Sequence, residues 1–301
     1  MPAALRSAVA FQETIIATQS SAPLAGRTAI VTGASRGIGR AFALRLAAAG
    51  AAVTVAAKSE TGSERLPGSI HSVVAEIEAA GGRALAQRTD VRSEDEIAAM
   101  VERTVATFGG VDILVNNAGA LWWEPVLATP VKRYDLMWQI NARASFLTAY
   151  YALPHMIEGG WGHIINCSPP ITLDATPGYV AYMTTKMGMT RVAIGIAAEH
   201  FADNVAANSL WPATPIESQA TINWASEKTG TREQWRTPDI LCDALLEIVT
   251  SEPRACTGRQ LIDETFLRER GWNDERIDAY WVTGKPPRDA IWIDGRAGAH
   301  M

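Results

Sequence analysis

A glycine-rich turn near the start of the chain joins a short β-branched run to a helical pattern. Residues 32–39 read TGASRGIG, so the glycines follow the spacing G-x-x-x-G-x-G. Glycine lets a backbone approach a pyrophosphate closely, and the first turn of a helix offers free N–H groups with a partial positive charge. A tight strand-to-helix turn without a ligand is the alternative interpretation. In this context the motif favours a dinucleotide site. Its candidate contacts are Gly33, Ser35, Arg36, Gly37, Ile38 and Gly39.

From Arg27 onward, short β-branched runs alternate with longer helical patterns, as in βαβ units built on a parallel sheet. Strands are predicted at 28–32, 52–57, 84–88, 113–116, 163–166, 205–210 and 260–262. Helices are predicted at 37–49, 70–80, 94–108, 131–156, 182–200 and 239–250. A capping box of Ser93 with Glu96 and the pair Pro238-Asp239 mark two helix starts. The pattern predicts an α/β fold with a doubly wound, seven-stranded parallel sheet and helices on both faces.

No Pro/Ser-rich linker divides the 301 residues, and α/β domains often reach about 250 residues around one sheet. We expect one domain at 26–265, an N-terminal extension at 1–25 and a C-terminal extension at 266–301. Glu13 interrupts the apolar run of the N-terminal extension before it could serve as a signal-peptide core, and an organelle-targeting segment stays an alternative. The C-terminal extension is expected to cover a site, to reach a partner subunit or to wrap loosely over the surface.

Bulk composition excludes several classes of function. The net charge of −5 provides no general electrostatic footprint for nucleic acid. The three cysteines, Cys167, Cys242 and Cys256, have neither CxxC nor metal-ligand spacing, and their odd number argues against a disulfide framework. We therefore expect no metal site and a reducing, cytoplasmic location. No segment approaches about 18 uninterrupted apolar residues, so no membrane span is expected.

Tyr182 and Lys186 stand four positions apart in an apolar, helix-like stretch. Residues at i and i+4 project from one helix face, so the ammonium can lie near the phenol and favour its ionised form. A phenol with a pKa of about 10 has to drop by about three units to exchange protons easily at neutral pH. The pair indicates proton-transfer chemistry, although a Tyr-x-x-x-Lys also occurs by chance in many helices.

Three motifs in order resemble those of the short-chain dehydrogenase/reductases. They are TGASRGIG at 32–39, NNAG at 116–119 and YMTTK at 182–186, and the resemblance covers roughly residues 26–265. It implies a Rossmann fold that binds NAD(P) along the carboxyl ends of the strands. The activity that it implies is hydride transfer between a nicotinamide cofactor and a substrate.

The resemblance also implies roles for individual residues. Tyr182 would be the catalytic acid/base, Lys186 would hold the ribose and lower the pKa of the tyrosine, and Asn141 would belong to a proton relay. A cap or kink in its helix is the structural alternative for Asn141, and a helix cap is the alternative for Asp90. The further cofactor contacts that the family implies are Asp90, Val91, Asn117, Ala118 and Gly119.

Two positions depart from the family pattern. The catalytic serine of the family usually lies one position nearer to the tyrosine, where this chain has Pro169, so Ser168 is the candidate substrate donor. The adjacent prolines restrict that loop, which either places the hydroxyl well or turns it away. The second departure is Pro212-Ala213, where the family commonly has Pro-Gly, and Thr214 stays a candidate contact to the carboxamide.

Six further segments are similar to hydroxysteroid dehydrogenase-like protein 2 and its bacterial relatives, a subfamily whose substrates are poorly defined. They are AAK at 56–58, LPG at 66–68, TPVKRYDLM at 129–137, CSPP at 167–170, LWPAT at 210–214 and TGRQLIDE at 257–264. No counterpart of the sterol-carrier domain found in some of those proteins is recognised in this sequence. The resemblance indicates a subfamily and leaves the substrate open.

Charge favours one form of the cofactor. The second predicted strand ends at Ala57 without the acidic residue that would bind a ribose 2′-hydroxyl, and Lys58 follows at once. An acid there would repel a 2′-phosphate, whereas Arg36 in the glycine-rich turn is a second cation able to reach it. NADP(H) is therefore preferred, with NAD(H) as the other possibility. In the alternative interpretation both cations are solvated surface charges.

Segments after Gly119, Ser168 and Pro212 are expected to line the substrate cleft. Their apolar and aromatic side chains suit a hydrophobic ketone or aldehyde and its alcohol. They are Leu121, Trp122, Trp123, Trp211 and Trp224. Packing against a neighbouring helix or a partner subunit is the alternative for the tryptophans.

The family resemblance further implies a homodimer or homotetramer. Two other functions stay open. One is a nucleotide-binding regulatory or scaffold protein with little turnover, which the proline at position 169 motivates. The other is epimerisation or dehydration with a bound cofactor that is recycled.

Overall fold

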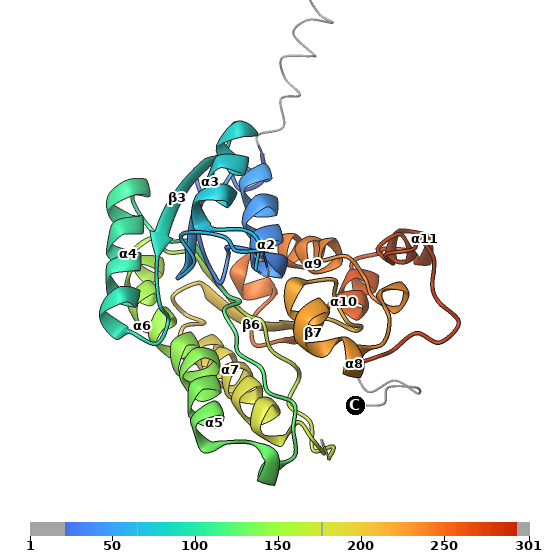
Figure 1. The fold of residues 1–301 in the computed structure, drawn as a ribbon. Coiled ribbons are helices and arrows are strands. Elements are labelled where there is room, and N and C mark those ends of the chain that lie inside the picture. The colour runs from blue at the N-terminus through green and yellow to red at the C-terminus, as the bar shows by residue number, and fades with distance from the viewer. Residues whose placement is uncertain (1–21, 65, 176, 294–301) are drawn as a thin grey trace, which may run out of the picture.

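The computed structural model describes residues 22–64, 66–175 and 177–293. Its centre is one sheet of seven parallel strands in the order β3-β2-β1-β4-β5-β6-β7 (Figure 1). The strands are β1 (Thr28–Thr32), β2 (Ala52–Ala57), β3 (Arg83–Arg88), β4 (Ile113–Asn116), β5 (Gly162–Asn166), β6 (Val205–Trp211) and β7 (Gln260–Ile262). The strand order reverses between β1 and β4, and doubly wound sheets bind ligands outside the carboxyl ends of the strands at such a point. The predicted sheet is confirmed, with each strand within one residue of its expected bounds.

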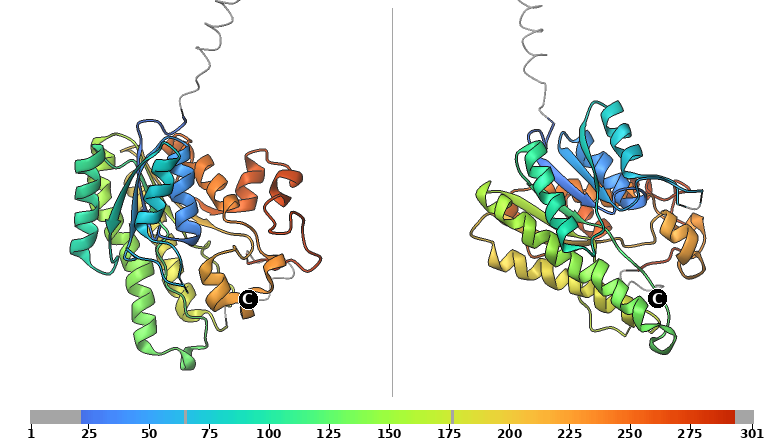
Figure 2. Two further views of the ribbon diagram at one scale, coloured as in Figure 1. Left: turned by 45° about the horizontal axis from the view of Figure 1, so that its top comes forward. Right: turned by 60° about the vertical axis from the view of Figure 1, so that its left-hand side comes forward.

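Helices cover both faces of the sheet (Figure 2). The longer ones are α2 (Gly37–Ala48), α3 (Ile70–Ala79), α4 (Glu94–Phe108), α5 (Val131–Trp138), α6 (Ala144–Glu158), α7 (Val180–Glu199) and α9 (Asp239–Val249). Side chains of β1 alternate between the two faces, as the period of two in a strand requires. Ala29 and Val31 lie in the core that α2, α3 and α9 cover, whereas Ile30 lies in the core that α4, α6 and α7 cover. The layered α/β architecture is therefore as the sequence predicts.

One expected helix, at 131–156, is divided in the structure. Its helical turns run through α5, then widen into a π turn at Gln139–Arg143, and continue as α6. The other expected long helices agree with the structure to within two residues at each end. Pro154 lies inside α6. The single uninterrupted helix that the sequence pattern predicts at 131–156 is thus wrong, and the interruption surrounds Asn141.

The start of α4 corrects two expectations about capping. Ser93 is the N-cap and accepts a hydrogen bond from the backbone N–H of Glu96. The carboxylate of Glu96 accepts from the backbone N–H of Asp90 and from Arg88, so the reciprocal half of the predicted capping box is wrong. Because Ser93 holds the cap position, Asp90 is not the helix cap. A complete capping box occurs at the start of α3, between Ser69 and Ser72.

The described part of the C-terminal extension packs closely against the domain. The helices α10 (Asp263–Glu269) and α11 (Asp274–Asp278) lie with α9 on the β7 side of the molecule (Figure 1). Trp272 and Tyr280 pack against the core that α9 covers, and Trp281 is only 2% exposed. The interpretation of a loose surface wrap is therefore wrong for the segment up to Trp281.

The N-terminal extension is described only from residue 22, so the targeting alternative for residues 1–21 falls outside the described part. Leu24 is 1% exposed and belongs to the core. Within residues 22–64, 66–175 and 177–293, no helix combines the length and apolar character required to cross a bilayer.

Candidate active site

The glycine-rich turn leads from the carboxyl end of β1 into α2. Gly33 and Gly37 have φ of +67° and +55°, a region that side chains with a Cβ rarely adopt. A Cβ on Gly39 would lie 2.4 Å from both the side-chain amide of Asn117 and the carbonyl oxygen of Gly33. The turn is therefore a cradle that only glycine can form, at the N-terminus of a twelve-residue helix. These residues fit the pyrophosphate of a dinucleotide.

The segment after β4 is bonded directly to this turn. The Thr32 hydroxyl accepts hydrogen bonds from the backbone N–H groups of Asn117 and Ala118, each at 3.1 Å. The side-chain amide of Asn117 donates to the carbonyl oxygen of Thr32 at 3.0 Å. These bonds hold the two strand ends on either side of the switch point at a fixed separation. Gly119 follows, and a Cβ on it would lie 3.6 Å from both Asn141 Oδ1 and Lys186 Nζ.

Asn141 is fully buried in the π turn between α5 and α6. Its side-chain amide donates to the carbonyl oxygen of Ala120 at 3.0 Å and to the Thr185 hydroxyl at 2.9 Å. Its Oδ1 accepts from the N–H of Ala120 at 2.9 Å. Asn141 therefore joins the loop after β4 to α7, beside the predicted catalytic pair. A kink in the helix describes only part of the setting of Asn141, since π turns often lie at functional sites.

Tyr182 and Lys186 lie on α7 and are 8% and 5% exposed. Lys186 Nζ donates to the carbonyl oxygen of Cys167 at 2.7 Å, and burial lowers the pKa of Lys186 to about 8. Burial raises the pKa of Tyr182, and the neighbouring Cys167 raises it further. The lowered tyrosine pKa that the family implies is therefore not found in the protein alone, because removal from water disfavours the charged phenolate.

Ser168 lies at the start of the loop after β5 and is fully buried. The Thr190 hydroxyl on α7 lies within hydrogen-bond distance of two groups, the Ser168 hydroxyl at 2.8 Å and the Pro169 carbonyl oxygen at 2.6 Å. Ser168 also donates weakly to the carbonyl oxygen of Asn166, at 3.4 Å. Among the described contacts, its hydroxyl is bonded to the protein interior and not to Tyr182.

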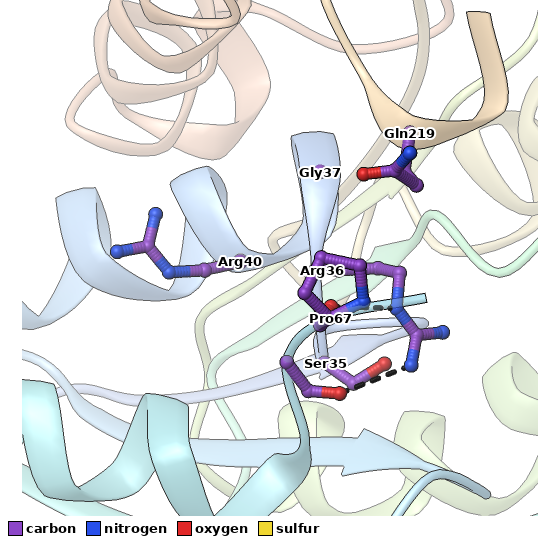
Figure 3. Close-up of a pocket in the computed structure, with 7 residues that line it drawn as sticks. Ser35, Arg36, Gly37, Arg40, Pro67 and Gln219 are labelled. Atoms are coloured by element: carbon purple, nitrogen blue, oxygen red, sulfur yellow. Dashed lines mark hydrogen bonds between the residues drawn. The ribbon is translucent and has the colours of Figure 1, made fainter. Parts of the chain in front are cut away.

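The cations expected to reach a 2′-phosphate lie at different places. Lys58 is exposed directly after β2. The Arg36 guanidinium donates to the carbonyl oxygens of Pro67 and Gly68, at 3.1 and 3.0 Å (Figure 3), and to that of Leu66 at 3.4 Å. Residues 59–69, a polar insert between β2 and α3, thus pack against the glycine-rich turn, which the sequence did not indicate. The cavity at this contact has a volume of about 260 Å³ and is lined by Ser35, Arg36, Gly37, Arg40, Pro67, Gly68 and Gln219.

Asp90 and Val91 follow β3 on the adenine side of the expected cofactor path. The Asp90 carboxylate forms a bidentate ion pair with Arg92, and this pairing lowers the pKa of Asp90 to about 2. Val91 is 8% exposed and belongs to the core that α4 covers. Ile38, in the glycine-rich turn, packs partly buried against the opposite core.

Aromatic side chains surround Tyr182 on its exposed side. The Trp123 ring lies 5.9 Å from the Tyr182 ring in an edge-to-face arrangement and 5.4 Å from the Tyr179 ring. Leu121, Trp122 and Trp211 pack into the same cluster. The side chain of Trp224 lies outside the described part. We call this cluster, residues 121–123, 179, 182 and 211, the aromatic wall.

Sequence reasoning missed two members of this region. Tyr179 is the N-cap residue of α7 and lies before the helix expected at 182–200, so the helical pattern did not include it. Lys228, in the short helix α8 (Ser226–Thr229), contacts the carbonyl oxygen of Trp123 and lies 3.6 Å from the Glu124 carboxylate. No sequence pattern signals Lys228, because its partners are about 100 residues earlier in the chain.

The loop after β6 completes the crevice. Ala213 and Thr214 are fully buried, and the Thr214 hydroxyl has no hydrogen-bond partner within residues 22–64, 66–175 and 177–293. A buried hydroxyl without a partner is costly, so this group is available to a ligand. Thr214 is one of the residues expected to contact the cofactor.

The model of the short chain dehydrogenase family matches residues 27–228. The chain belongs to this family. Its members are NAD(P)-dependent oxidoreductases, and the resemblance stated from the three sequence motifs is confirmed. Hydroxysteroid dehydrogenase-like protein 2 of Xenopus tropicalis is 43% identical over 274 residues, which are 90% of this chain. The chain spans 64% of the length of that relative.

Solved structures share the fold. A putative dehydrogenase from Xanthomonas campestris has a TM-score of 0.82 at 43% identity, over 89% of this chain and 96% of that one. A 7α-hydroxysteroid dehydrogenase, complexed with NADH and 7-oxo glycochenodeoxycholic acid, has a TM-score of 0.70 at 27% identity, over 80% and 94%. A metagenomic short-chain oxidoreductase in complex with NADP has a TM-score of 0.66 at 29% identity, over 80% and 98%. The Rossmann-type fold is thereby confirmed.

Proposed function

We propose that the protein interconverts a hydrophobic ketone or aldehyde and its alcohol by hydride transfer, with NADP(H) as its cofactor. The observation that carries this proposal is the meeting of four features at one end of the sheet. The glycine cradle, the Asn141 side chain, the Tyr182 and Lys186 pair and the aromatic wall all lie at the carboxyl end of the sheet. A nicotinamide bound there would supply or accept the hydride.

Tyr182 is the proposed acid/base. Its hydroxyl lies in a buried setting next to Trp123, so water is largely excluded from the place where a substrate oxygen would exchange a proton. Because burial keeps the phenol protonated, it is suited to donate a proton during carbonyl reduction. Lys186, with a pKa of about 8, carries a positive charge on most molecules at pH 7. We propose that this ammonium binds the ribose and favours the ionised phenol during turnover.

Asn141 and Ser168 are proposed to support the same step. Asn141 holds Ala120 and Thr185 in place and so keeps the loop after β4 against α7. Ser168 is proposed to orient the substrate oxygen, which requires its hydroxyl to turn from the protein interior toward the crevice. Among these residues, Ser168 therefore has the least direct structural support.

The preference for NADP(H) rests on charge. Lys58 stands after β2 with no acidic residue at the end of that strand. Arg36 is bonded to carbonyl oxygens, which carry no formal charge, so the guanidinium keeps its net positive charge beside the glycine-rich turn. Two cations at this end of the sheet favour a 2′-phosphate over a 2′-hydroxyl. Relatives of this fold have been solved with NADH and with NADP, and NAD(H) stays the other possibility.

A second candidate function is nucleotide binding with little turnover, in a regulatory or scaffold role. The burial of Ser168 and its bond to Thr190 favour this alternative. A cytoplasmic location and a homodimer or homotetramer stay predictions.

The test of the proposed function is a panel of hydrophobic ketones, aldehydes and alcohols, assayed with NADPH and NADH side by side. We expect turnover with NADPH, and we expect Tyr182→Phe to lower kcat by about a thousandfold, since removal of a general acid costs 10²- to 10⁴-fold. The Kd of NADPH, measured by fluorescence, should stay within about twofold because the phenyl ring is retained.

Tyr151→Phe is the matched control, since the Tyr151 hydroxyl contacts Glu94 on the outer surface of α4. It should leave kcat unchanged. Turnover that survives Tyr182→Phe would refute the assignment of the acid/base. Tight binding of NADPH without turnover on the whole panel would support the scaffold alternative instead.

A further inference from the structure

The loop that follows β6 is held by residues from three later segments of the chain. The N–H of Ala213 donates to Asp263 Oδ1 at 2.8 Å, and the carbonyl oxygen of Ala213 accepts from the N–H of Ile293 at 2.8 Å. Two residues further, the N–H of Arg236 donates to the carbonyl oxygen of Pro215 at 2.9 Å. Glu217 then donates its N–H to the carbonyl oxygen of Arg236 at 2.8 Å. Residues 213–217, which we call the β6 loop, are thus bonded at both ends.

Asp263 is placed for this task by the sheet. Trp211 of β6 pairs with Ile262 of β7, so the chain leaves both strands at the same level, and Asp263 lies beside Ala213. The Asp263 carboxylate is fully buried. Its Oδ1 also accepts from the N–H of Glu264 at 2.6 Å, while Oδ2 has no partner within the described residues. A buried carboxylate carries a high desolvation cost, so its presence here needs a reason beyond packing.

Arg236 forms the second attachment and is 1% exposed. Its Nη1 donates to Glu264 Oε2 at 2.7 Å. The guanidinium lies 4.3 Å from the centre of the Trp281 ring and 5.5 Å from that of Trp292. The backbone of Arg236 forms one bridge with Ile216 and another with Trp281. The C-terminal segment therefore covers the guanidinium of Arg236, and the backbone of the same residue holds the β6 loop.

Thr214 lies between these attachments, with its hydroxyl buried and without a partner in the described part of the chain. The N–H and the carbonyl oxygen of the preceding residue, Ala213, are both fixed by hydrogen bonds. Movement of the β6 loop would displace the Thr214 hydroxyl.

We propose that Asp263, Arg236 and the C-terminal segment 281–293 are positioning elements that fix the β6 loop so that Thr214 can contact the bound cofactor. The proposal rests on the proposed cofactor site, to which Thr214 belongs. None of these groups is required to touch the substrate. They act by removing the freedom of a loop that would otherwise have to be ordered when the cofactor binds, and prior ordering increases affinity.

The test compares Asp263→Ala with Asp263→Asn in the full-length protein. Alanine removes the acceptor of the Ala213 N–H, whereas asparagine retains a carbonyl oxygen at Oδ1. We expect Asp263→Ala to raise the Kd of NADPH about tenfold, which is about 1.4 kcal/mol, and Asp263→Asn to leave it within about twofold. The Kd is measured by NADPH fluorescence at a temperature where circular dichroism shows both variants folded.

Asp112 offers a matched control at the opposite, amino ends of the central strands β1 and β4, where its Oδ2 accepts from the N–H of Thr28 at 2.8 Å. Asp112→Ala should lower Tm and leave the Kd of NADPH unchanged. If Asp263→Ala does not fold, Ile293→Pro removes the N–H that donates to Ala213 and should raise the Kd about threefold.

The outcomes separate the two proposals. An unchanged Kd in Asp263→Ala, or in Ile293→Pro where the alanine variant does not fold, would overturn the positioning role. A rise in Kd that is equal in Asp263→Asn and Asp263→Ala would also overturn it, because the acceptor would then be irrelevant. Failure of the parent protein to bind NADPH would instead refute the proposed function.

Discussion

Burial shifts the pKa values of the two central residues of the site, Tyr182 and Lys186, in opposite directions. It raises the pKa of Tyr182 and lowers the pKa of Lys186 to about 8, so both residues are shifted toward their neutral forms. In the protein alone, Tyr182 is thus a protonated phenol, and Lys186 is an ammonium whose pKa of about 8 lies close to neutral pH. In this setting the anionic phosphates of a cofactor would raise the pKa of Lys186, because opposite charges favour ionisation.

Ser168 provides a test at the scale of one residue. If it orients the substrate oxygen, Ser168→Ala should lower kcat about a hundredfold, as loss of one donor to a developing oxyanion does. The Kd of NADPH should not change. Ser145→Ala is the control, since Ser145 is equally buried and its hydroxyl donates to the carbonyl oxygen of Ala142. A kcat within threefold of the parent would indicate that Ser168 only packs against Thr190.

At the scale of an element, the insert at 59–69 is the least expected part of the cofactor region. Gly68 has a φ of +94°, and a Cβ there would lie 2.5 Å from the carbonyl oxygen of Ser35. The close approach allows Arg36 to reach the carbonyl oxygens of the insert. The insert therefore determines where the Arg36 guanidinium lies.

Gly68→Ala should displace the insert and release Arg36 from its three carbonyl partners. We expect the ratio of the Kd of NADH to that of NADPH to fall about fivefold, since about 1 kcal/mol is a typical net contribution of a hydrogen bond. Gly81→Ala is the control. Gly81 also has a positive φ, of +83°, but a Cβ there meets no described atom within 4 Å. It should therefore lose stability without a change in the ratio, and an equal fall in both variants would contradict the role of the insert.

The π turn illustrates why some elements could not be predicted from the sequence. Residues 131–156 have a continuous helical pattern, and nothing in it marks an extra residue per turn at Asn141. The turn is stabilised by three hydrogen bonds: Asn141 donates to Ala120 and to Thr185 and accepts from the N–H of Ala120, and both partners lie outside this helix. Tertiary contacts therefore override the local helical preference at this position.

For the molecule as a whole, the sheet and its helices could be predicted because strand and helix periods are local in the sequence. Tyr182 and Lys186 could be paired for the same reason. The attachments of the β6 loop could not, since Asp263 is 50 positions from Ala213 and Glu264 is 28 positions from Arg236. The hydrogen bond from Lys186 to the carbonyl oxygen of Cys167 could likewise not be predicted from the sequence.

Two buried groups, Asp263 and His163, should change the free energy of unfolding in opposite directions as pH rises. Burial raises the pKa of Asp263 to about 6, an effect that the adjoining N–H groups and Arg236 reduce and Glu264 increases. The folded protein therefore binds this proton more tightly than the unfolded chain, and stability falls as pH rises from about 4 to 6. Burial lowers the pKa of His163 to about 4, so its contribution to stability rises over a similar range.

Each shift is about two pKa units, or about 3 kcal/mol, so the two contributions nearly cancel in the parent protein. Asp263→Asn removes one of them. The free energy of unfolding of this variant, measured with urea, should increase relative to that of the parent by about 3 kcal/mol between pH 4 and pH 7. His163→Gln should show the opposite slope relative to the parent. Because each comparison is a difference from the parent, contributions of other groups such as Asp90 drop out. A constant difference between Asp263→Asn and the parent would mean that Asp263 does not titrate in this range, and the burial of its carboxylate beside Ala213 would then have to be reconsidered.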